Sequence, residues 1–131
     1  MSRVSVVIPA LNDSAMLRRC LNALAVQTLP ADEVIVVDNG STDDTTAIAL
    51  AAGARVIAEP IWGIFPATAA GFDEASGDLI ARLDADSVPP PDWIGRIVAV
   101  FESQPELTAL SGPGRFYGST RVVHWVAETL Y

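Results

Sequence analysis

The chain has 131 residues, of which 50% are hydrophobic and 18% are charged, so it can bury the core of one domain and is not a disordered chain. Sixteen acidic residues against eight basic ones give a formal net charge of −8, which argues against binding to DNA or RNA. All eight basic residues are arginines, which excludes mechanisms that need a Schiff-base or P-loop lysine.

Short β-branched runs alternate with helical patterns along the chain, as in successive β-α-β units. The predicted strands are Val4–Ile8, Glu33–Val37, Arg55–Ala58, Asp78–Leu83 and Leu107–Leu110. The predicted helices are Ser14–Val26, Asp43–Ala52, Pro66–Ala75 and Asp92–Ser103. This order predicts an α/β fold in three layers, with a mostly parallel sheet and helices on both of its faces.

The chain reads as a single domain over residues 1–131. The stretch 112–114 separates the regular part, 1–114, from an irregular or helical segment, 115–131, in which His124 and Trp125 are expected to pack a helix. Cys20 falls at a helical core spacing, and we interpret it as a core residue. The apolar run Val4–Leu11 is too short for a signal peptide or a membrane span, so we expect a cytoplasmic protein.

Polar residues follow the carboxyl ends of three predicted strands: Asn12 after the first, Asp38 after the second, and Asp84 with Asp86 after the fourth. Ligands of open α/β sheets bind at the carboxyl ends of the strands, where the strand order reverses. A strand order of 3-2-1-4 would line one crevice with residues 9–12 and 84–86, with Asp38 alongside. Such an acidic crevice would bind a diphosphate through a bridging cation, so Asp84 and Asp86, on one side of an extended segment, indicate a site for a hard divalent metal.

Plainer interpretations of these acids stay open. In one such interpretation, Asp84 and Asp86 only end a strand and cap the next turn. Asp38 would begin a strand-to-helix turn, with a positive φ at Gly40 and a helix cap at Ser41, or its carboxylate would accept N–H groups from a nucleobase.

The sequence excludes two other classes of metal-dependent protein. An EF-hand loop starting at Asp84 would need glycine at its sixth position and glutamate at its twelfth, where Gly95 stands. Phosphatases of the haloacid dehalogenase type share the pattern of residues 84–88, DADSV, but that family also requires a lysine, which the chain lacks.

Four motifs, in order and at matching spacing, resemble glycosyltransferase family 2 from residue 3 to about residue 114. They are VVIPALND at 6–13, VVDNGSTDDT at 36–45, ASGD at 75–78 and LDADSVP at 83–89. The resemblance implies a GT-A fold, Rossmann-like, that binds a nucleoside-diphosphate sugar with Mn²⁺ or Mg²⁺ and transfers the sugar with inversion. It also implies roles by position: Pro9, Ala10 and Asn12 border the nucleoside, Asp38 holds the base, Asp84 the ribose and Asp86 the metal.

The chain also departs from the family pattern. Leu11 and Asp13 stand where the family usually has an aromatic residue and a glutamate. Thr68 and Ala69 replace an arginine and an asparagine, so one cation expected near the nucleotide is missing. The region in which the family supplies its general base falls after Tyr131, so we expect the acceptor half to be absent from a truncated domain.

Three hypotheses follow. The leading one is the donor-binding part of a glycosyltransferase with an unknown acceptor. The second is a catalytically inactive nucleotide-binding or interaction module. The third is a nucleotidyltransferase-like enzyme, although residues 9–12 lack the glycine-rich basic loop of that class.

Further expectations concern the isolated chain. A truncated domain exposes apolar surface, which predicts self-association or marginal stability. Membrane association, on the cytoplasmic side, would come through regions beyond this chain. We expect no sugar transfer by residues 1–131 alone, because Asp92, Glu102 and Glu106 fall on or beside one helix and Glu128 falls on a solvated helix face.

Overall fold

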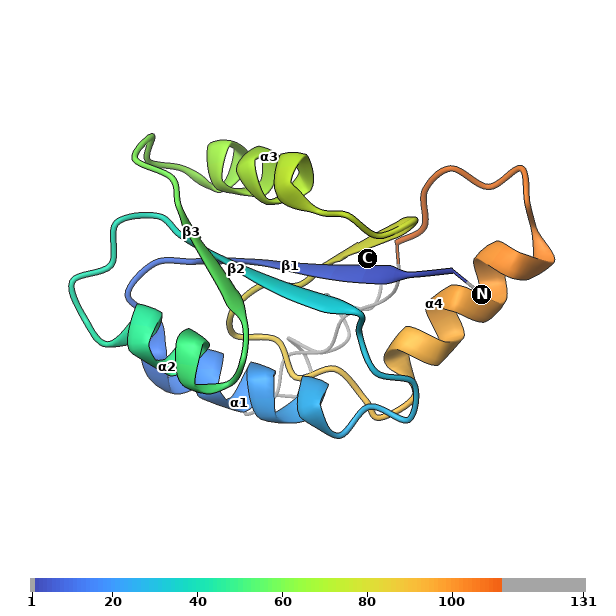
Figure 1. Ribbon diagram of the computed structural model, residues 1–131, viewed down its shortest axis with the longest axis horizontal. Helices are drawn as coiled ribbons and strands as arrows, with labels where there is room; N and C mark the ends of the chain where they lie inside the picture. The colour runs from blue at the N-terminus through green and yellow to red at the C-terminus, as the bar shows by residue number, and fades with distance from the viewer. Residues whose placement is uncertain (1, 112–131) are drawn as a thin grey trace, which may run out of the picture.

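The computed structural model describes residues 2–111, which fold around a four-stranded sheet (Figure 1). The strands are β1 (Val4–Ala10), β2 (Glu33–Asp38), β3 (Arg55–Ala58) and β4 (Leu79–Arg82). Their order is β3-β2-β1-β4, and every pairing is parallel. This is the strand order under which the sequence predicted one crevice. All seven residues of β1 are buried, as expected of a central strand whose sequence is almost continuously apolar.

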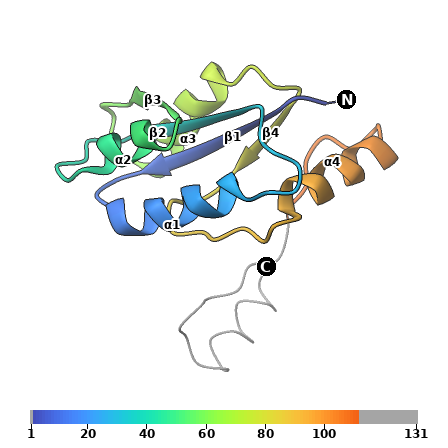
Figure 2. The same cartoon turned by 60° about the horizontal axis from the view of Figure 1, so that its bottom comes forward.

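Helices cover both faces of the sheet, which confirms the three-layer prediction (Figures 1 and 2). The helices are α1 (Ser14–Ala25), α2 (Thr45–Ala51), α3 (Ile64–Glu74) and α4 (Trp93–Ser103). Alternate residues of β1 face opposite layers. Val4, Val6 and Ile8 pack with residues of α1, α2 and α4, whereas Val7 packs with Ala67 of α3.

Helix α3 approaches the sheet closely because Gly71 has no side chain. A β-carbon built on Gly71 would lie 2.3 Å from Cγ1 of Val7 and 3.0 Å from Cγ2 of Val37. Only glycine fits at this contact, and it fixes the height of α3 above β1 and β2.

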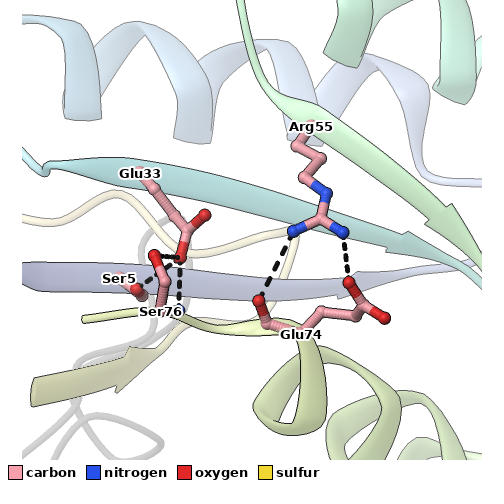
Figure 3. A network of polar contacts seen from close by, with 5 residues as sticks. All are labelled: Ser5, Glu33, Arg55, Glu74 and Ser76. Atoms are coloured by element: carbon pink, nitrogen blue, oxygen red, sulfur yellow. Dashed lines mark hydrogen bonds and ion pairs between the residues drawn. The ribbon is translucent and has the colours of Figure 1, made fainter. Parts of the chain in front are cut away.

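A polar network joins α3 to the sheet at the amino ends of the strands (Figure 3). The buried hydroxyl of Ser5 donates to Oε1 of Glu33 at 2.7 Å, and the backbone N–H of Ser76 donates to the same oxygen at 2.7 Å. The hydrogen bond from Ser5 is the largest cause that lowers the pKa of Glu33. Arg55 pairs with Glu74 beside this network. These acids serve the packing of α3 and lie at the edge opposite to the predicted crevice.

The four predicted helices and the first four predicted strands are found, with their ends shifted by at most two residues, whereas the fifth predicted strand is not. The predicted strand Leu107–Leu110 is wrong: this segment is irregular, and three of its four side chains are exposed, so a strand there would have no face to bury. Helix α3 begins at Ile64 rather than Pro66, with Pro66 in its first turn, where a missing N–H costs nothing.

One further result concerns membrane spans, and several expectations concern residues that the structure does not describe. Among residues 2–111, no helix combines the length and the apolar character needed to cross a membrane. The expectations for the boundary at 112–114, the segment 115–131, His124, Trp125 and Glu128 lie outside the described residues.

Candidate functional site

The parallel register brings the loops at the carboxyl ends of the strands together. Ala10 pairs with Asp38, so the loops that follow β1 and β2 start side by side. Val7 pairs with Arg82, the last residue of β4, so Asp84 follows this pairing by two residues at the same end of the sheet. The structure therefore places all six predicted site residues along one edge of the sheet, as the predicted strand order requires.

Asn12 ties the loop after β1 to the loop after β2. Its backbone has φ of 49°, a conformation that asparagine tolerates better than most residues. Its side-chain oxygen accepts hydrogen bonds from the backbone N–H of Thr42 at 2.7 Å and of Asp43 at 3.4 Å, and its own N–H donates to Oγ of Ser41 at 3.0 Å. Asn12 thus shapes this edge, with its side-chain oxygen engaged by the protein.

Asp38, at the end of β2, is also engaged within its own loop. Oδ1 accepts the backbone N–H of Ser41 at 2.8 Å, and Oδ2 accepts the hydroxyl of Thr46 at 2.7 Å. Burial raises the pKa of Asp38, but hydrogen bonds from Thr46, Ser41 and Gly40 outweigh burial and hold it below its usual value. Gly40 has the predicted positive φ, 100°. The turn at Asp38 and Gly40 is therefore built into the structure, but the predicted helix cap at Ser41 is wrong, because α2 begins at Thr45, directly after Asp44. Any ligand would meet an Asp38 carboxylate that is already hydrogen-bonded and ionised.

Asp84 and Asp86 lie after the end of β4 in a tight turn, in which the N–H of Ser87 donates to the carbonyl oxygen of Asp84 at 3.0 Å. The prediction of an extended segment is wrong here, because the strand stops at Arg82. The outward placement of the two acids still holds, since Leu83 and Ala85 are buried while Asp84 and Asp86 are exposed.

We call the edge of the sheet that carries Asp38, Asp84 and Asp86 the acidic edge. Arg82 is a cation at this edge, and it was not predicted from the sequence. Its guanidinium donates to Oδ1 of Asp84 at 2.9 Å and to the hydroxyl of Thr68 on α3 at 3.2 Å. Thr68 is the position at which the expected arginine was missing, and Arg82 reaches it from β4. The signal was available in the sequence: Ala81 faces the core, so strand alternation turns Arg82 to the other face, where α3 lies.

Asp13 also lies at the acidic edge, and this was not predicted from the sequence either. Burial raises its pKa, and the negative charges of Asp86 and Asp43 raise it further. Asp43 is held by Thr45, whose hydroxyl and backbone N–H both donate to Oδ1, and it accepts the N–H of Ser14 at 3.3 Å through Oδ2. Carboxylates from the first two loops thus add their negative potential to that of Asp86.

The donor set suits a hard divalent cation that completes its coordination with a ligand. Within the part of the chain that the structure describes, no group of three or more His, Cys, Asp and Glu side chains is placed to hold a metal ion by itself. Magnesium is usually bound by one or two carboxylates together with substrate phosphates and water, so an exposed Asp86 in an acidic setting fits that mode.

The structure confirms the interpretation of Cys20 as a core residue. It is buried on α1, and burial raises the pKa of its thiol to about 12, with further contributions from the charges of Asp86 and Asp84. Its Sγ lies 3.9 Å from the carbonyl oxygen of Asp84. The thiol therefore packs beneath the turn that carries the two acids and stays protonated at neutral pH.

The sequence matches the family model described as Glycosyl transferase family 2 over residues 5–128. It is 38% identical over 104 residues to a protein named glycosyltransferase AglE from Haloferax volcanii, covering 73% of this chain and 34% of that protein. It is 42% identical over 111 residues to undecaprenyl-phosphate 4-deoxy-4-formamido-L-arabinose transferase from Serratia proteamaculans, covering 76% of this chain and 34% of the relative. The chain therefore spans about a third of the length of these relatives.

Solved structures match the fold as well. Glucosyl-3-phosphoglycerate synthase from Mycobacterium tuberculosis, in complex with Mn²⁺ and UDP-glucose, superimposes with a TM-score of 0.68 and 32% identity, covering 79% of this chain and 40% of that one. TarS residues 1–349 from S. aureus superimposes with a TM-score of 0.74 over 85% of this chain and 39% of that one, at 21% identity, and bears on the fold alone. These matches confirm the expected GT-A fold.

Proposed function

Because the chain belongs to glycosyltransferase family 2, we propose that it is the donor-binding part of an enzyme that transfers a sugar from a nucleoside diphosphate. The observation that carries this proposal is the acidic edge formed by the loops after β1, β2 and β4. Burial raises the pKa of Asp13, and the negative charges of Asp86 and Asp43 raise it further. A diphosphate would be repelled by the same field unless a divalent cation neutralised it.

The proposed roles follow the positions of the side chains. Asp86 would hold Mn²⁺ or Mg²⁺, whose charge offsets that of the departing diphosphate. Asp84 would face the ribose with Oδ2, since Arg82 occupies Oδ1. Asp38, fixed by Ser41 and Thr46, would offer its remaining lone pairs to the base.

The remaining predicted contacts come from the end of β1. Pro9 and Ala10 would border the nucleoside as the wall of the crevice. Asn12 would act indirectly, since its side-chain oxygen holds the loop after β2 in place.

We propose that the acceptor is a phosphorylated lipid. The relatives named for undecaprenyl phosphate reach 42% identity, whereas the synthase solved with phosphoglyceric acid and UDP-glucose reaches 34%. Deprotonation of the acceptor needs a base within hydrogen-bond reach, and we propose none among the acids at α4: Asp92, just before the helix, pairs with Arg96, and Glu102 stands in its last turn. We therefore expect residues 1–131 to bind the donor without transferring the sugar.

Calorimetric titration with UDP, ADP, GDP and CDP tests the donor site. We expect one of them to bind with Mn²⁺ present and at least tenfold more weakly in chelator, because the acids otherwise repel its phosphates. Asp86→Asn should remove the metal effect. Asp92→Asn is the matched control, since Asp92 is also an exposed acid and pairs with Arg96 at the start of α4.

Equal affinity with metal and with chelator, or equal losses in the two variants, would remove the metal role from Asp86. A folded chain that binds none of the four nucleotides would refute the donor site and leave an interaction module.

A further inference from the structure

Arg82 differs in position from the other arginines that the structure describes. It is the last residue of β4, so it lies at the acidic edge. The other arginines among residues 2–111 precede or begin a strand at the opposite edge or lie on helices: Arg3 and Arg55 for the strands, and Arg18, Arg19 and Arg96 for the helices. Within this part of the chain, Arg82 is therefore the arginine that ends a strand where the ligand of an open α/β sheet binds.

The side chain of Arg82 lies on the α3 side of the sheet. Arg82 pairs in register with Val7, which packs with Ala67 of α3. Side chains of paired residues in a sheet point to the same face. The guanidinium accordingly meets Thr68 of α3, whereas Asp13 directly precedes α1, which packs on the other face. Arg82 thus brings a positive charge to the acidic edge from the side opposite to α1.

Two hydrogen bonds fix the guanidinium of Arg82. Its Nε donates to Oγ1 of Thr68 at 3.2 Å, and its Nη2 donates to Oδ1 of Asp84 at 2.9 Å. A guanidinium has five N–H groups. Within residues 2–111 Arg82 makes no other hydrogen bond, so three of its N–H groups remain for a ligand.

Stability alone is a weak explanation for the pair of Arg82 and Asp84. The two side chains are 35% and 58% exposed, and ion pairs exposed to this extent contribute little because water screens them. A planar guanidinium that is already held at two points is, by contrast, well prepared to bind a phosphate through parallel N–H groups.

We propose that Arg82 binds a phosphate of the donor directly and thereby makes the site favour a nucleoside diphosphate over the unphosphorylated nucleoside. The proposal rests on the proposed function, because it concerns the donor of that reaction. The acids of this edge repel phosphates, and a cation at Asp86 would offset only part of that repulsion. Arg82 adds a positive charge that belongs to the protein itself.

A competing interpretation is that Arg82 only orients the carboxylate of Asp84. Asp84 is proposed to meet the ribose, which UDP and uridine share. Loss of Arg82 would then weaken the binding of both compounds equally. Direct contact with a phosphate instead predicts a larger loss for UDP than for uridine.

Titration of the 131-residue chain with UDP and with uridine, both in Mn²⁺, compares Arg82→Met with the wild type. Calorimetry measures the affinity for UDP, and NMR shifts measure the weaker affinity for uridine. We expect the loss for UDP to exceed the loss for uridine by about threefold or more, because methionine keeps the apolar stem and removes every N–H group. The same difference should remain when both proteins also carry Asp84→Asn, which removes the charge that Arg82 would orient.

Arg55→Met is the matched control. Arg55 also lies on a strand and pairs with an acid, Glu74, but at the opposite edge of the sheet, so its loss should change neither affinity. Arg82→Gln replaces Arg82→Met if circular dichroism shows that the latter does not fold. If another of the four nucleotides binds in place of UDP, that nucleotide and its own nucleoside are the probes.

Three results would overturn the proposal while leaving the proposed function intact: equal losses for UDP and uridine, a difference that disappears with Asp84→Asn, or the same difference in Arg55→Met. A folded wild type that binds none of the four nucleotides would instead refute the proposed function, and this role of Arg82 with it.

Discussion

The hydroxyl of Thr46 donates a 2.7 Å hydrogen bond to Oδ2 of Asp38, which links the first turn of α2 to the last residue of β2. Ser41 holds the other carboxylate oxygen through its backbone N–H. The residue proposed to meet the nucleobase is thus also the residue that closes the loop after β2, and the two roles can be separated by experiment.

Asp38→Ala should lower the free energy of unfolding by about 1–3 kcal/mol, because the variant loses an ionised hydrogen-bond acceptor and leaves its two donors without an acceptor. Urea titration at neutral pH measures this change. Thr46→Val removes one of the donors and should cost less than Asp38→Ala. Unchanged stability together with weaker nucleotide binding would contradict the loop-closing role.

The stabilisation by Asp38 should depend on pH in a defined direction. Its pKa in the folded state is below the value of 3.8 for an unperturbed aspartate, so the stabilisation is present above about pH 4 and is lost as the pH falls through the folded pKa. The difference in unfolding free energy between wild type and Asp38→Ala should therefore shrink in acid. A difference that stays constant down to pH 2 would argue against an ionised hydrogen-bond acceptor.

Asp86→Asn should lower the pKa of Asp13 towards its ordinary value, because one of the two repelling charges disappears. The raised pKa of Asp13 means that its ionised form is penalised by folding, a penalty present above the folded pKa and relieved as the pH falls through it. At neutral pH the variant should gain about 0.2–1 kcal/mol of stability. NMR titration of the Asp13 carboxyl carbon checks the shift, with Asp92→Asn as the control that should leave it unchanged.

Arg82→Ala should weaken nucleotide binding, because Asp84 loses the partner that orients its carboxylate and Thr68 loses a donor. We expect a loss of about 1 kcal/mol, close to fivefold in Kd, measured by calorimetry. Stability should change by less than about 1 kcal/mol, since the pair is partly exposed. Arg96→Ala removes another exposed arginine, which pairs with Asp92 at the start of α4, so an equal loss of affinity there would contradict a specific role for Arg82.

Gly71→Ala should destabilise the fold by about 1–3 kcal/mol, because its β-carbon would overlap Val7 and push α3 away from the sheet. Gly95→Ala is the matched control on another helix, since the nearest atom to its added β-carbon is Cβ of Leu29 at 3.9 Å. That variant should gain about 0.5–1 kcal/mol from helix propensity. Thermal unfolding compares the two, and similar behaviour of both would contradict the close contact between α3 and β1.

Much of the fold was decided by local patterns. Strands buried on both faces need continuous apolar runs such as VSVVI at 4–8 and VIVV at 34–37, and these runs predicted β1 and β2. The alternation of strands and helices then fixed a parallel sheet, and strand ends in a parallel sheet share one edge, so the site could be located before its contacts were known. The strand at Leu107–Leu110 was predicted wrongly because local composition does not show whether a segment has a surface to cover.

Other features depended on contacts between segments far apart in the chain. The bond from Thr42 to Asn12 spans 30 residues, and the bonds from Asn39 to Glu59 and Ile61 span 20 and 22. Hydrogen-bond partners at such separations depend on the strand register, the paths of the loops and the height at which α3 packs. A local sequence pattern predicts none of these. The sequence alone therefore determined the fold class and the residues at the acidic edge. Only the tertiary structure decided that Asn12 and Asp38 are already hydrogen-bonded there, that Arg82 reaches Thr68, and that Trp62 and Phe65 are exposed.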